Sequence, residues 1–114
     1  MKHLSIEEII EMNKAVGATG ALVNRGNLEF TLANIRDSEN IVKCSAGLLF
    51  GIITGHCFLD GNKRTAFMAM VTFLKINGKG IKISQKDAEK LVSDIARDKY
   101  NKEKVENIIE KLIA

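Results

Sequence analysis

Two long apolar runs on either side of a short polar stretch constrain the fold of this chain most. The runs extend over residues 41–53 and 66–76, and the polar stretch between them is residues 56–65: His56, Cys57, Phe58, Leu59, Asp60, Gly61, Asn62, Lys63, Arg64 and Thr65. Placed on a helix, each run is apolar on every side, which predicts two helices buried all round. Folding alone gives no reason for polar groups to gather between two buried helices. We therefore interpret residues 56–65 as the active site.

Length and composition indicate one globular domain, residues 1–114, with its own apolar core. The net charge of +3 is low for a nucleic-acid-binding domain, so we expect no direct nucleic-acid partner. Cys44 and Cys57 lack zinc-site spacing and suggest reduced thiols in a cytoplasmic protein. The sequence shows no signal peptide and no apolar run long enough to span a membrane, so we expect no membrane contact.

Hydrophobic periodicity and capping residues predict an all-α bundle of about six helices. Ser5 and Glu8 form a capping box that begins a helix over residues 6–15. Asp37 or Ser38 is expected to cap the first buried helix, which runs to residue 54, and the second is expected over residues 62–76. Apolar stripes over residues 88–95 and 105–112 predict two further helices with solvated outer faces.

The segment of residues 17–30 is the hardest to interpret. Residues 24–27, Asn-Arg-Gly-Asn, have the composition of a tight turn and are flanked by the short apolar pieces 21–23 and 28–30. This pattern fits either a short β-hairpin or an irregular flap. A short helical turn is expected to follow over residues 31–35.

The polar stretch predicts an anion site at the start of the second buried helix. A helix N-terminus presents free N–H groups and the positive end of the helix dipole, and Gly61 allows the backbone to approach a ligand closely. Asn62, Lys63 and Arg64 add a cap and two cations, so the anion is expected to be a phosphate.

Two further residues complete a site for phosphoryl or nucleotidyl transfer. Asp60 is placed to hold Mg²⁺ beside a polyphosphate, and the imidazole of His56 can take a proton from a hydroxyl near neutral pH. Phe58 alternates with the polar residues and is expected to anchor the loop in the core. Together these residues would provide a base, a metal ligand and a phosphate cradle.

Each of these residues also has a purely structural interpretation. His56 could cap the preceding helix, Asp60 could form an Asp-Gly turn, and Asn62 could serve only as an N-cap. Lys63 and Arg64 could be solvated surface charges. The occurrence of all of them between two buried helices favours the functional interpretation.

Residues 56–66 resemble the signature of the Fic/Doc family, in its death-on-curing (Doc) branch. The family pattern is H-x-F-x-[D/E/N]-[G/A]-N, followed by G-R in Fic enzymes and by K-R-T in Doc proteins. The match covers about a tenth of the chain. The resemblance implies a small all-helical Fic fold in which His56 is the general base, Asp60 binds Mg²⁺, Phe58 anchors the loop, and Gly61, Asn62, Lys63 and Arg64 bind phosphate. It also implies that residues 22–30 position the target.

The resemblance implies ATP and Mg²⁺ as cofactors and a protein target with a Ser or Thr hydroxyl. Fic enzymes transfer AMP, whereas Doc proteins transfer the γ-phosphate of ATP to a threonine of a translation elongation factor and are inhibited by a separate antitoxin chain. Lys63 stands where AMP-transferring members have Gly, and Phe67 where they have a second Arg, which favours the kinase. The alternatives are a Fic-type adenylyltransferase and, from another class, an inactive nucleotide-binding regulatory module.

Overall fold

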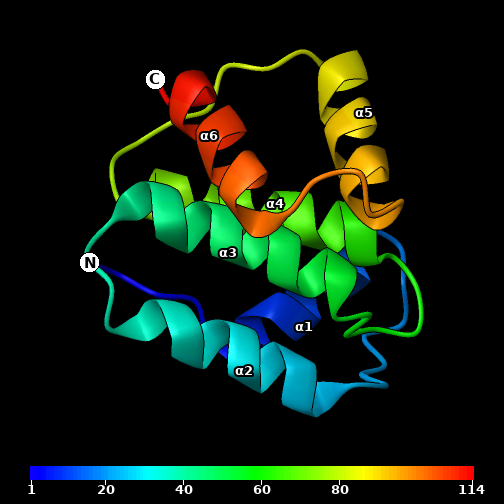
Figure 1. The fold of residues 1–114 in the computed structure, drawn as a ribbon. Coiled ribbons are helices and arrows are strands. Elements are labelled where there is room, and N and C mark those ends of the chain that lie inside the picture. Colours follow the sequence, from blue (N-terminus) through cyan, green and yellow to red (C-terminus); the bar gives the residue numbers. More distant parts are fainter.

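Six helices form in the computed structural model, which describes all residues 1–114 (Figure 1). There is no sheet, so the predicted all-α fold is confirmed. No helix has both the length and the apolar character that a membrane crossing requires. The helices are α1 (Ile6–Ala15), α2 (Arg25–Arg36), α3 (Ile41–Thr54), α4 (Asn62–Ile76), α5 (Gln85–Ala96) and α6 (Lys102–Leu112).

Most of the helices begin at a side chain that satisfies a free backbone N–H group. The hydroxyl of Ser5 accepts a hydrogen bond from the N–H of Glu8, and the N–H of Ser5 donates to the Glu8 carboxylate in return, which is the predicted capping box. Asn40, Ser84 and Asn101 cap α3, α5 and α6 in the same position.

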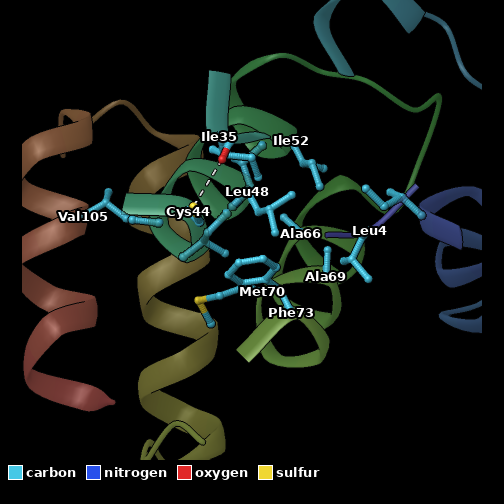
Figure 2. Close-up of a cluster of buried hydrophobic side chains, with 14 of the residues drawn as sticks. Leu4, Ile35, Cys44, Leu48, Ile52, Ala66, Ala69, Met70, Phe73 and Val105 are labelled. Carbon is cyan, nitrogen blue, oxygen red and sulfur yellow. Dashed lines mark hydrogen bonds between the residues drawn. The ribbon is translucent and has the colours of Figure 1, made fainter. Parts of the chain in front are cut away.

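Helix α3 lies at the centre of the fold, with α1 and α2 on one side and α5 and α6 on the other (Figure 1). Helices α3 and α4 lie side by side and supply nearly half of the buried hydrophobic residues. In Figure 2, Leu48 and Ile52 of α3 meet Ala66, Met70 and Phe73 of α4, and all of these side chains are fully buried. The two predicted buried helices therefore form the central pair, and the loop that joins them reaches the surface at one end.

Helices α2 and α3 pack closely at two glycines of α3, Gly47 and Gly51. A Cβ atom at Gly47 would lie 2.8 Å from Cγ2 of Ile35, and one at Gly51 would lie 2.6 Å from Cγ2 of Thr31. Real Cβ contacts are not this short. The separation of the two helices is therefore one that only glycine permits.

The structure corrects the prediction for residues 24–27, which do not form a tight turn. Residue 24 is the N-cap of α2, and residues 25–27 form its first turn. Helix α2 buries Leu28, Leu32 and Ile35 at helical spacing. This burial outweighs the turn propensity of Asn-Arg-Gly-Asn, which is only a weak local preference.

Of the two alternatives for residues 17–30, a β-hairpin or an irregular flap, the hairpin does not form, and residues 16–24 are irregular. Their β-type pairing is limited to a single antiparallel bridge between Leu22 and Phe58. The predicted cap of α3 is wrong by two or three positions, because Asn40 rather than Asp37 or Ser38 accepts the N–H of Lys43.

Candidate active site

The loop between α3 and α4, residues 55–61, and the first turn of α4 carry the predicted active-site residues. His56, Asp60, Lys63 and Arg64 have exposed side chains, while the side chain of Phe58 is only 1% exposed and sits in the core. A surface cavity of about 300 Å³ is lined by six of the predicted residues: His56, Asp60, Gly61, Asn62, Lys63 and Arg64. The structure therefore brings the predicted site together, with Phe58 beneath it.

The N-terminus of α4 presents free main-chain groups suited to binding an anion, and we call it the candidate anion cradle. The N–H groups of residues 60–64 have no acceptor within the chain. They lie at the positive end of the α4 dipole, where a negatively charged ligand is stabilised. Gly61 begins the helix with φ of 75°, and a Cβ there would lie 3.1 Å from Cβ of Ala18. Both the backbone angle and the available space favour glycine at this position.

Asn62 has a different structural role from the one that the sequence predicts for its side chain. Its Oδ1 accepts the N–H of Phe58 at 2.8 Å, and its Nδ2 donates to the carbonyl of the same residue at 2.8 Å. The amide thus closes the loop on itself and holds Phe58 in the core. A phosphate would meet the main-chain N–H of Asn62 rather than its side chain.

A buried asparagine on α1, Asn13, holds the other side of the loop. The residue is 1% exposed, and its Nδ2 donates to the carbonyl of Asp60 and to Oγ1 of Thr65, both at 2.9 Å. Its Oδ1 accepts the N–H of Gly20 at 2.8 Å. Our sequence analysis missed this residue, although a polar side chain on the apolar face of α1, one turn after Ile9, is a detectable signal.

Two asparagines of α2 bind the backbone around the histidine. Nδ2 of Asn24 donates to the carbonyl of His56 at 2.8 Å, and Nδ2 of Asn27 donates to the carbonyl of Gly55 at 2.6 Å. The N–H groups of Val23 and Asn24 both donate to the carbonyl of Cys57, at 2.9 and 3.1 Å. A role for these two side chains was not predicted, because the composition of residues 24–27 indicates a turn.

The backbone of His56 adopts a left-handed conformation, with φ of 44°. For a residue with a Cβ, this region costs about 1–2 kcal/mol relative to the right-handed one. The conformation persists because hydrogen bonds hold the carbonyls of Gly55, His56 and Cys57 in place. An outlier of this kind at a cavity is a common property of functional sites.

The charged groups of the cavity are free to bind a ligand. None of the ion pairs in the structure involves His56, Asp60, Lys63 or Arg64. Burial raises the pKa of the neighbouring Cys57 thiol to about 11, so it is protonated at neutral pH and is not a nucleophile there. The imidazole is the group of this loop suited to proton transfer near pH 7.

Asp60 is a single carboxylate rather than part of a metal-binding cluster. No group of three or more His, Cys, Asp or Glu side chains is placed to hold a metal ion. One free carboxylate beside a phosphate cradle fits Mg²⁺, which keeps several waters and takes its other ligands from phosphate oxygens.

A larger apolar groove of about 840 Å³ adjoins the site. Lys63 and Arg64 line its rim, and Phe67, Met68 and Val71 of α4 form one wall. The rest of the lining comes mainly from α5 and the segment before it: Ile81, Ile83, Ser84, Gln85, Ala88, Glu89 and Val92. Any molecule that fills this groove at the rim would contact the two cations of the candidate anion cradle.

Comparison with known proteins gives two matches. The model of the Fic/DOC family matches residues 3–74, which include α1 to α3, the loop and nearly all of α4. The chain is also 30% identical, over 88 residues, to a protein of Escherichia phage P1 called protein kinase doc, in an alignment that covers 68% of this chain and 70% of that protein. On the strength of both matches and of the loop that they include, the chain belongs to the Fic/Doc family.

Proposed function

We propose that this protein is a Doc-type toxin that transfers the γ-phosphate of ATP to a Ser or Thr hydroxyl of a cytoplasmic target protein. The observation that carries the proposal is a single cavity that holds an exposed imidazole, free main-chain N–H groups and two unpaired cations. The similarity to a phage protein called a protein kinase supports it. The resemblance of residues 56–66 to the Doc branch of the family implies a translation elongation factor as the target.

In the proposed reaction, His56 removes the proton from the target hydroxyl as its oxygen attacks the γ-phosphorus. A new P–O bond forms to the target, and the bond from the γ-phosphorus to the β,γ-bridging oxygen breaks, so that ADP leaves with the bonding electrons. The N–H groups at the start of α4, with Lys63 and Arg64, bind the phosphate oxygens. Asp60 would hold Mg²⁺, which neutralises phosphate charge when bound.

The side chains at two positions favour phosphoryl transfer over AMP transfer. Lys63 extends from the first turn of α4 at the cavity, where a glycine would leave room for further phosphates. Phe67, one turn later, faces the apolar groove and supplies no charge to clamp a second phosphate.

Radiolabelled ATP tests this assignment. Purified protein is incubated with Mg²⁺, cell lysate and ATP labelled at either the γ- or the α-phosphate. We expect a labelled lysate protein only with γ-label, and no label with His56→Ala. Label from the α-phosphate would establish the adenylyltransferase instead. Absence of label from both, together with intact ATP binding, would indicate the inactive regulatory module.

We also propose that the antitoxin is a separate chain and that it occupies the apolar groove beside the site. The groove is mainly apolar, and of its four charged lining residues three are cations, Lys63, Arg64 and Lys75, and one is Glu89. This excess of positive charge suits an amphipathic segment with acidic residues at its edge. Coexpression of the adjacent gene product tests this: Val71→Asp should prevent the complex and restore growth arrest. An unchanged complex would refute the groove as the docking site.

A further inference from the structure

We infer that Asn24 and Asn27 are positioning residues that hold His56 in its active orientation. This inference rests on the proposed function, in which His56 is the base. Neither side chain lines the cavity of about 300 Å³, so neither is placed to contact ATP or the target hydroxyl there. They act on the reaction only through the backbone on either side of the histidine.

The hydrogen bonds of Asn24 indicate a role beyond helix capping. It occupies the N-cap position of α2, yet its side chain makes no capping hydrogen bond. Asparagine is among the best N-cap residues, so the helix forgoes a stabilising contact here. The amide instead donates to the carbonyl of His56 at 2.8 Å, which lies 32 positions further along the chain.

The two asparagines fix successive peptide groups at the point where the backbone is least favourable. Asn27 holds the carbonyl of Gly55 and Asn24 holds that of His56, on either side of the residue with φ of 44°. Without these donors, His56 can relax to a negative φ, and the imidazole turns away from the cavity. The released carbonyls would also be free to turn toward the bound phosphates, and the negative carbonyl oxygens would repel the phosphate oxygens.

The irregular segment of residues 16–24 stays attached to the loop between α3 and α4 when these two side chains are lost. The main-chain N–H groups of Val23 and Asn24 donate to the carbonyl of Cys57, and that of Leu59 donates to Ala21. These contacts do not depend on the side chain at position 24. A variant of Asn24 therefore keeps the fold and loses only the hold on His56.

The test uses Asn24→Asp, Asn24→Ala and Asn27→Ala, with Asn34→Ala as the matched control. Asn34 is an exposed asparagine of the same helix whose side chain makes no hydrogen bond. Asn24→Asp is nearly isosteric and remains a good N-cap, but it has no proton to donate to the His56 carbonyl. Its melting temperature should stay at or above that of the wild type.

Two readouts separate positioning from general stability. In ¹⁵N-labelled protein, the three-bond HN–Hα coupling and the imidazole resonances of His56 should change in Asn24→Asp and stay as in the wild type in Asn34→Ala. With γ-labelled ATP, kcat should fall about 10- to 100-fold with KM for ATP unchanged, because a small displacement of a reacting group has an effect of this size.

The outcomes also separate this inference from the proposed function. Unchanged His56 resonances in Asn24→Asp, or a kcat equal to that of Asn34→Ala, would overturn the positioning role. If the wild-type protein transfers no phosphate at all, the proposed function fails, and the His56 resonances still decide whether the asparagines hold the residue.

Discussion

Replacement of Gly51 by alanine should destabilise the protein and weaken its activity, although the residue lies more than a helical turn before His56. A Cβ at this position would approach Cγ2 of Thr31 at 2.6 Å and Cβ of the same residue at 3.0 Å. Thr31 is buried and β-branched, so its side chain has no free rotation with which to move away. Helix α2 must shift instead, and Asn24 and Asn27 shift with it.

The size of the effect follows from two opposing contributions. Overpacking of a close contact costs about 1–3 kcal/mol, and we take the upper half of this range because the clash reaches Cβ of Thr31. Alanine in place of glycine in a helix returns about 1 kcal/mol. The net loss of about 1–2 kcal/mol lowers Tm by about 4–8 °C in a domain of this length, as calorimetry or thermal circular dichroism would show.

Gly26→Ala is the control, because it makes the same change in α2 where a Cβ would meet nothing within 4 Å. It should raise stability by about 0.4–1 kcal/mol. Thr31→Ala combined with Gly51→Ala should recover part of the loss, since it removes the atom at 2.6 Å. The reasoning is refuted if Gly51→Ala is as stable as Gly26→Ala, or if the double variant recovers nothing.

Three further predictions concern the site. Burial raises the pKa of Cys57 from 9.0 to about 11, so the folded state keeps a proton that the unfolded chain releases. The free energy of unfolding should therefore fall by about 2–3 kcal/mol between pH 9 and pH 11. Urea unfolding of Cys57→Ala should lack this pH dependence. Asn13→Ala should lower the free energy of unfolding in urea by about 2–4 kcal/mol, because it leaves the N–H of Gly20 and other groups without a hydrogen-bond partner. A loss below 1 kcal/mol would contradict this. Arg64→Ala should weaken ATP binding about 10- to 100-fold by calorimetry, whereas Lys86→Ala, at a position that lines neither the cavity nor the groove, should not.

The helices whose ends are determined locally were predicted well. Helix α1 begins at the expected capping box, and α4 begins and ends at the predicted residues because Gly61 and Asn77 flank an uninterrupted run. Helix α2 was predicted only in part. The helical spacing of Leu28, Leu32 and Ile35 predicts a helix, but the turn composition of residues 24–27 was given more weight, so only a short turn over residues 31–35 was expected.

The candidate site divides in the same way. Contiguous residues in one loop revealed the imidazole, the carboxylate and the cations, and the structure places them around one cavity. The asparagines that support the loop come from α1 and α2, and a sequence does not state which distant carbonyl an amide will meet. Asn62 shows a related limit, since its side chain binds Phe58 rather than facing the ligand.

The hydrogen bonds that hold the candidate catalytic loop come from distant parts of the chain, which limits how far this loop can be transplanted. Residues 55–61 obtain their shape from donors on α1 and α2 and from the first turn of α4. Grafting only residues 56–66 onto another helical scaffold would transfer the candidate catalytic side chains without the asparagines that hold the loop. The imidazole would then be free to turn away. A successful graft needs the two N-terminal helices as well, so the smallest portable unit is most of the domain.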